Sequence, residues 1–135
     1  MITLAAAQRG LAAGVAAAEA MSVAVSLAIV DAGGILRAFA RMDGAEIAGE
    51  VLAVDKAFTA VSHRTATGEL AQLAAPGGEL FGLHANGRGR YVLFGGGLPI
   101  AAGSEVVGGV GVSGATAAQD VRCAEAVLGA LDLGA

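Results

Sequence analysis

The chain has 135 residues, a formal net charge of −4, an isoelectric point near 5.0 and a hydrophobic content of 56%. This length predicts a single domain over residues 1–135, and the negative charge with eight dispersed basic residues argues against a nucleic-acid partner. No apolar run reaches the roughly 18 residues of a membrane span, so we expect a cytoplasmic protein. Its high hydropathy indicates apolar surface that is buried between subunits, and we expect a homo-oligomer, a dimer or larger.

A helix and a strand open the chain. Thr3 is placed to cap a helix that ends near Met21. Residues 23–30 then alternate with a period of two and are apolar on both faces, which predicts a strand buried on both sides. The run Asp31, Ala32, Gly33, Gly34 follows and predicts the tight turn of a hairpin.

The returning strand, residues 35–42, places Arg37 and Arg41 on one face. Directly after it, Asp43 and Glu46 have the spacing of a capping box, in which the first side chain accepts from the helix and the second reaches back. A second helix is therefore predicted to begin at this point.

Two stripes run along that second helix. Apolar residues follow one another in steps of four and three and predict its core-facing side: Ile47, Val51, Val54, Phe58 and Val61. Another side carries Leu52, Lys56, Thr59 and His63. This second stripe is either a solvated face or the wall of a pocket or subunit interface that presents a cation, a hydroxyl and an imidazole together.

A short third helix and a glycine-rich loop come next. Thr67 can cap the helix, which must stop before Pro76. Residues 77–89 contain too many glycines for regular structure and predict a mobile loop. This loop and the residue that follows it supply three candidate ligand-contacting side chains: His84, Arg88 and Arg90.

The C-terminal part alternates apolar runs with short glycine turns. Residues 91–94, 98–102 and 106–112 are predicted as strands, and Thr116 with Gln119 forms a capping box for a last helix. The predicted order is α-β-β-α-α-β-β-β-α. It indicates an α+β fold in which a five-stranded antiparallel sheet is flanked by helices.

One glycine motif invites a dinucleotide-binding interpretation. Gly109, Gly111 and Gly114 match G-x-G-x-x-G between a strand and a helix. The chain ends before the further parallel strand and acidic residue that such a unit requires. We therefore expect these glycines to let a helix or a neighbouring subunit lie close to the sheet.

Several segments together resemble one known family over nearly the whole chain. They are Ile29–Gly34, Arg41–Ala45, Lys56–Ala57 with Thr59–Ala60, Gly97–Ile100, Val106–Gly114 and Gln119–Asp120. In this combination the chain resembles the GlcG/HbpS-like family, also found as the C-terminal domain of PduO-type proteins and often labelled haem-binding or haem-degrading. The resemblance implies a profilin-like, GlcG-like sheet and assembly into dimers or higher oligomers. Some members bind haem or a corrinoid.

The first functional hypothesis is a small-molecule-binding protein that takes haem or a related tetrapyrrole near helix 45–63. His63 or His84 would supply the imidazole to iron, and no other metal site is expected. The propionates and the pocket wall would be met by Arg37, Arg41, Lys56, Thr59 and Arg90. Where relatives commonly carry an aromatic residue and a proline, this chain has Val61–His63 and Thr65, so His63 is either a ligand of this subgroup or part of a repurposed pocket.

Two other functions remain open. An isomerase, cyclase or lyase could use a pocket at a subunit interface, with His63 moving a proton and Lys56 or Arg41 holding a carboxylate or oxyanion. A non-catalytic oligomer could instead bind a metabolite or a sensor protein. Convergence of His63, Lys56 and Arg41 on one cavity would support both pocket hypotheses, and separate orientations would weaken both.

Overall fold

The computed structural model describes residues 1–133; residues 134 and 135, which complete the predicted domain, lie outside the described part. The helices are α1 (Leu4–Ala20), α2 (Ala48–His63), α3 (Thr67–Leu73) and α4 (Ala117–Ala130), with short 3-10 helices η1 (Leu83–Ala85) and η2 (Gly87–Gly89). The strands are β1 (Ser26–Asp31), β2 (Leu36–Arg41), β3 (Gly97–Ala102) and β4 (Glu105–Ser113). In residues 1–133, no helix is both long and apolar enough to cross a membrane.

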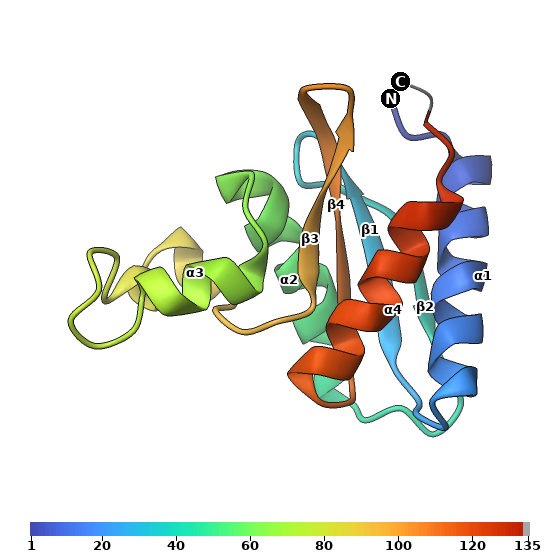
Figure 1. The fold of residues 1–135 in the computed structure, drawn as a ribbon, viewed down its shortest axis with the longest axis horizontal. Helices are drawn as coiled ribbons and strands as arrows, with labels where there is room; N and C mark the ends of the chain where they lie inside the picture. The colour runs from blue at the N-terminus through green and yellow to red at the C-terminus, as the bar shows by residue number, and fades with distance from the viewer. Residues whose placement is uncertain (134–135) are drawn as a thin grey trace.

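The sheet is antiparallel with the strand order β2-β1-β4-β3 (Figure 1). The α+β class and the flanking helices are confirmed, but the sheet has four strands and the predicted strand at residues 91–94 is absent. The reason is local: the Val92 amide donates to the Thr59 hydroxyl, at 3.0 Å, and forms no strand ladder. Gly96, with φ of 131°, bends the chain before β3 begins.

The turn between β1 and β2 is the one predicted. Asp31 Oδ1 accepts hydrogen bonds from the amides of Gly33 and Ile35, at 2.9 and 3.0 Å, and Gly34 has a positive φ of 78°. Such a φ carries little steric cost for glycine, which has no Cβ. Asp31 is therefore a turn residue.

Helices cover both faces of the sheet. Helices α1 and α4 pack together on one face, where the larger core lies, and α2 covers the other (Figure 1). On the α2 side the backbones approach closely, because a Cβ on Gly109 or Gly111 would clash with the carbonyls of Ala57 and Ala53. The expectation of a close-packed helix is confirmed for Gly109 and Gly111, whereas Gly114 lies against Ala24 and Val25.

Helix α2 differs from its prediction in two respects. It begins at Ala48, and its N-cap, Ile47, makes no side-chain capping bond, so the predicted Asp43 and Glu46 box does not form. The start of the predicted core stripe also points outward, with Ile47 81% and Val51 62% exposed, whereas Val61 at its other end is buried as predicted. The buried side is built chiefly from small residues: Gly49, Ala53, Ala57 and Ala60. Only small side chains fit against the glycines of β4.

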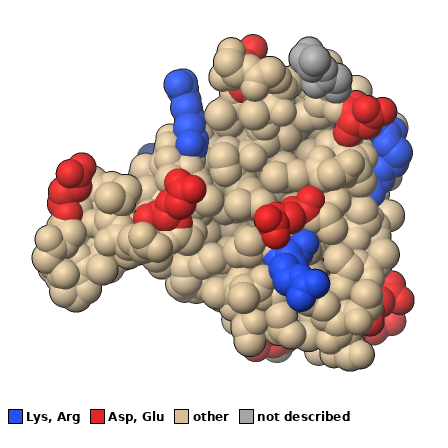
Figure 2. All heavy atoms as spheres, in the orientation of Figure 1, with Lys and Arg blue, Asp and Glu red and all other residues tan. Residues whose placement is uncertain are grey.

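Helix α3 and the segment after it project beyond the β3 edge of the sheet as an arm (Figure 1). Thr67 does not cap α3; Ala66 occupies that position, and Thr67 Oγ1 accepts from the Gly97 amide at 2.9 Å, which ties the arm to β3. The glycine-rich loop predicted as irregular contains η1 and η2. On the face of the molecule seen in Figure 2, positive and negative side chains are scattered among uncharged ones.

Candidate functional site

His63 ends helix α2 with a defined ring orientation. Its Nδ1 lies 3.1 Å from the carbonyl oxygen of Thr59, one turn earlier. A carbonyl oxygen only accepts, so Nδ1 must carry the proton and donate. In the neutral ring Nε2 then keeps its lone pair, which is the form in which an imidazole binds a metal.

Two aromatic rings lie near the C-terminal end of α2, and one of them packs against His63. The Tyr91 ring meets the His63 ring edge-on with centroids 4.4 Å apart, and it stacks on Phe58 at 6.1 Å. The guanidinium of Arg90 lies 3.7 Å from the centre of the Phe58 ring, and its Nε donates to Asp55 Oδ1 at 2.9 Å. This leaves a partly exposed imidazole bordered by the Tyr91 ring, with Phe58 and the half-exposed Arg90 next to that ring.

Thr59 is buried and has a structural task. Its hydroxyl donates to the Asp55 carbonyl at 2.7 Å and accepts from the Val92 amide at 3.0 Å. It thereby fastens residues 90–92 to α2, which holds Tyr91 against His63. The hydroxyl is not presented to a ligand.

Lys56 is 1% exposed and lies beneath the Phe94–Gly97 segment. Its ammonium donates to the Val112 carbonyl at 2.8 Å and to Asp120 Oδ2 at 3.2 Å, and the ring centre of Phe94 is 5.0 Å away. Burial lowers the pKa of Lys56 and raises the pKa of Asp120, and in each case the partner's charge opposes the shift. The pair joins α2 to the start of α4.

Arg41 lies in different surroundings. It lines a hollow of about 470 Å³ formed by α1, the end of β2 and the residues after it: Val15, Glu19, Ala40, Arg41, Met42 and Asp43. Neither Lys56 nor His63 lines this hollow. His63, Lys56 and Arg41 therefore do not converge on one cavity, which weakens the enzyme and tetrapyrrole hypotheses in the form that uses all three residues. Arg37 is exposed on β2.

His84 belongs to η1 on the projecting arm and is exposed. Within residues 1–133 it has no side-chain hydrogen bond, and none of the described contacts joins it to the rings around His63. Of the predicted ligand-binding residues, the structure brings together His63, Thr59 and Arg90. Lys56 lies one turn before Thr59 and two turns before His63 along α2 but is turned into the interior.

The sequence analysis did not identify several residues that shape this region. Tyr91 had been assigned to a strand, and Phe58 to the core stripe. Asp55, which was not singled out from the sequence, holds Arg90. Asp120 had no assigned role, because its partner Lys56 is 64 residues away and no local spacing signals that pairing.

Comparisons with known proteins agree on one family. Residues 2–129 match the family model described as "Haem degrading protein HbpS-like". An uncharacterized 15.0 kDa protein from the dhaT–dhaS intergenic region of Citrobacter freundii is 41% identical over 127 residues, covering 94% of this chain and 89% of that protein. The corrinoid adenosyltransferase PduO of the same organism is 39% identical over 116 residues, covering 86% of this chain but 35% of PduO.

Solved structures support the same grouping. The Klebsiella pneumoniae protein ORFY is 39% identical with a TM-score of 0.94, covering 97% of this chain and 90% of that one. A structure described as a complex of PduOC with haem is 35% identical with a TM-score of 0.91, covering 95% of this chain and 93% of that one.

Proposed function

The chain belongs to the HbpS-like family, and from that premise we propose that it binds haem or a related tetrapyrrole on the outer side of α2, where His63 would hold the iron. The observation that carries the proposal is the hydrogen bond from His63 Nδ1 to the Thr59 carbonyl, at 3.1 Å. It directs the lone pair to Nε2 and fixes the plane of the ring. Ligating histidines in metalloproteins are characteristically held in this way.

The surroundings of His63 suit the proposed ligand. Tyr91 and Phe58 offer apolar ring surfaces to a macrocycle, and Arg90 offers a cation to a propionate. Only Nε of Arg90 is engaged with Asp55, so its two terminal nitrogens remain for a second carboxylate. A bound haem supplies a redox-active iron; the residues of this chain hold and orient it.

Other predicted contacts take supporting roles in this proposal. Thr59 and Lys56 position α2 and the 90–97 segment, because their polar groups are buried and already bonded. His84 and Arg41 are not assigned to the ligand. The relative described as a complex with haem makes a tetrapyrrole the preferred ligand class. The chain matches 35% of the length of PduO, and the proposal does not include the adenosyltransferase activity of that protein.

The test is a titration of the purified protein with haemin, followed by the Soret band. We expect saturable binding by the wild type. The dissociation constant should rise about tenfold or more in His63→Ala, because the variant lacks one ligand to the iron. The matched control is His84→Ala, which removes the chain's other histidine and should leave binding unchanged. A titration that does not saturate, or one unaffected by His63→Ala, contradicts the proposal.

A second titration tests Arg90. Arg90→Gln should weaken haemin binding but leave the binding of haemin dimethyl ester unchanged, because the ester lacks the propionate charge. Equal weakening for both ligands would instead show that Arg90 acts only through its packing on Phe58.

A further inference from the structure

We propose that Asn86 is a site of spontaneous deamidation, and that the isoaspartate formed there loosens Tyr91 from His63. Asn86 is the chain's only asparagine, and glycine follows it in the sequence. The pair lies on the arm, at the junction of η1 and η2, and the Asn86 side chain is exposed. An effect of this change on haemin binding rests on the proposed function of His63.

The reaction needs only these two residues and water. The Gly87 backbone nitrogen bonds to Cγ of Asn86, the bond from Cγ to Nδ2 breaks, and the proton of the Gly87 amide is lost as ammonia departs. Water then opens the resulting five-membered succinimide ring at one of its two carbonyl carbons, which gives aspartate or isoaspartate. Both products carry a new negative charge, and isoaspartate also adds one methylene group to the main chain before Gly87. Asparagine counts among the thermolabile residues of proteins.

Both reacting groups are free in the folded chain. The Asn86 side chain makes one hydrogen bond, from Nδ2 to the Gly82 carbonyl, and at 3.5 Å this exposed bond is long and weak. The Gly87 amide donates to no acceptor within residues 1–133. Since glycine has no Cβ, no side chain shields the attacking nitrogen. Neither the leaving group nor the nucleophile is therefore held away from the reaction.

The fold requires glycine at position 87 but not asparagine at position 86. Gly87 has a φ of 61°, and an added Cβ would lie 2.6 Å from carbons of the Tyr91 ring. Any other residue there would be strained and would displace the ring. Asn86 has extended backbone, with φ of −103° and ψ of −177°, which other residues adopt equally well. The residue that makes Asn86 labile is thus fixed by its packing on Tyr91.

The same packing connects the reaction to His63. Gly87 lies against the Tyr91 ring, which in turn meets the His63 ring edge-on with centroids 4.4 Å apart. A methylene group inserted before Gly87 shifts that backbone relative to the ring, so Tyr91 loses its support on this side. Loss of the contact between the two rings corresponds to about a threefold to tenfold higher dissociation constant for haemin.

The first experiment follows the intact mass of the purified protein during storage in warm, mildly alkaline buffer. We expect the wild type to gain one mass unit, and tryptic mapping to locate the gain in residues 65–88. The gain should be slower in mildly acidic buffer, because the attacking amide must lose its proton. Asn86→Gln is the matched control: glutamine keeps the amide but closes its larger ring far more slowly, so this variant should show no gain.

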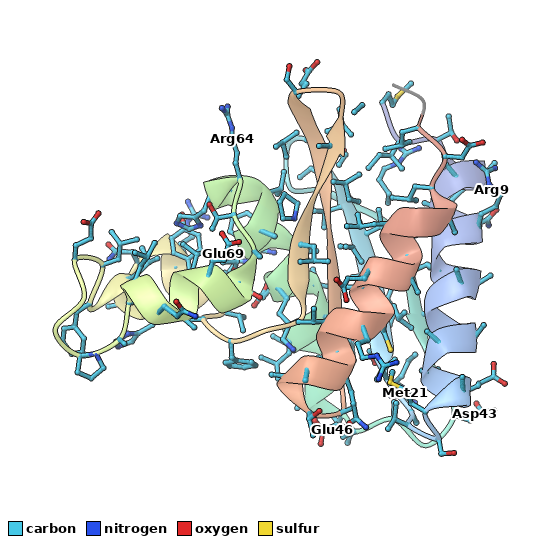
Figure 3. The ribbon with its side chains drawn as sticks, in the orientation of Figure 1. Arg9, Met21, Asp43, Glu46, Arg64 and Glu69 are labelled. Atoms are coloured by element: carbon cyan, nitrogen blue, oxygen red, sulfur yellow. The ribbon has the colours of Figure 1, made fainter. Side chains whose placement is uncertain are left out.

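Asp43 serves as an internal comparison. It also precedes a glycine, so it can form isoaspartate through the same ring, but without a change of mass. It lies after β2, at the opposite edge of the sheet from the arm (Figure 3). Isoaspartate that persists in stored Asn86→Gln is therefore assigned to Asp43 and should leave Tyr91 undisturbed.

The second experiment observes Tyr91 directly. Tyr91 is the chain's only tyrosine and no tryptophan is present, so the tyrosine band in near-UV circular dichroism reports on this ring. We expect the band to weaken in the stored wild type, and haemin to bind that sample about threefold to tenfold more weakly than the fresh protein. Fresh Asn86→Asp, which has the charge without the methylene group, should match the fresh wild type in both respects.

An unchanged mass, under conditions that fully convert a synthetic peptide of residues 83–90, overturns deamidation in the folded chain, and so does an equal gain in Asn86→Gln. A mass gain with an unaltered Tyr91 band overturns the link to His63. A failure of the tetrapyrrole proposal would appear separately: the fresh wild type would show no saturable haemin titration, while its mass and its Tyr91 band would still change during storage.

Discussion

Lys56 Nζ lies 3.2 Å from Asp120 Oδ2, and their side chains are 1% and 3% exposed. The two residues come from α2 and α4, which pack on opposite faces of the sheet, and they meet at the end of β4 beside Val112. Each also has a second partner: the Val112 carbonyl accepts from Lys56, and Asp120 Oδ1 accepts from the Ala115 amide at 3.0 Å.

Asp120→Asn should lower the free energy of unfolding by about 3–5 kcal/mol at neutral pH, because it leaves a buried ammonium without its counter-charge. The loss should shrink as the pH rises toward 10.5, the ordinary pKa of lysine. Burial lowers the pKa of Lys56 in the folded state, so the unfolded chain binds that proton more tightly and stability relative to the wild type rises with pH. Urea unfolding at several pH values measures this slope.

Lys56→Met should show the opposite slope. It leaves Asp120 buried and unpaired, and burial raises the pKa of that carboxyl above 3.8. The folded variant then binds a proton more tightly than the unfolded chain, so its stability relative to the wild type should rise as the pH falls toward 3.8. Parallel slopes for the two variants would contradict the assigned ion pair.

The exposed ion pair should behave differently from the buried one. Arg90 and Asp55 are 37% and 15% exposed, and water screens a pair of this kind. Arg90→Gln should therefore lower stability by only about 1 kcal/mol, including its loss of stacking on Phe58. A loss as large as that of Asp120→Asn would show that Arg90 has a larger structural role.

Thr59→Val should lower stability by about 1–3 kcal/mol, since it leaves the buried Val92 amide without an acceptor. Thr59→Ser keeps the hydroxyl and should cost less than Thr59→Val. Chemical denaturation compares the two. If the serine variant were the less stable, packing of the threonine methyl group would matter more than the hydrogen bond.

Two glycine substitutions test how tightly α2 packs on the sheet. Gly111→Ala should be strongly destabilising, because the new Cβ would clash with the Ala53 carbonyl. Gly129→Ala, in α4 with open space around the added methyl group, should raise stability by about 0.5–1 kcal/mol through helix propensity. Thermal unfolding of both variants checks the contrast; similar melting temperatures would contradict it.

Local chemistry made several features predictable from the sequence. The turn at Asp31 and the caps at Thr3 and Thr116 depend on residues within a few positions of each other, and all three form. The predicted polar stripe on α2 was partly informative: it identified Lys56, Thr59 and His63 as neighbours but did not separate the two buried residues from the half-buried one.

The orientation of α2 was not predictable in the same way. Periodicity identifies an apolar stripe but does not say whether the chain's own sheet or another surface will cover it. Hydrophobicity favours Ile47 and Val51 for the core, yet the glycines of β4 admit only a helix face of small residues. The deciding information lies in Gly109 and Gly111, about 60 residues farther along the chain.

The direct contact of α2 with the glycines of β4 has a consequence for how this protein can change. Because the backbone of α2 packs directly against the backbone of β4, the position of the helix depends little on its outward side chains. Substitutions on the outer side can therefore alter what the molecule recognises without moving the scaffold beneath. New specificities can arise there one residue at a time, while the alanine and glycine positions tolerate almost no variation.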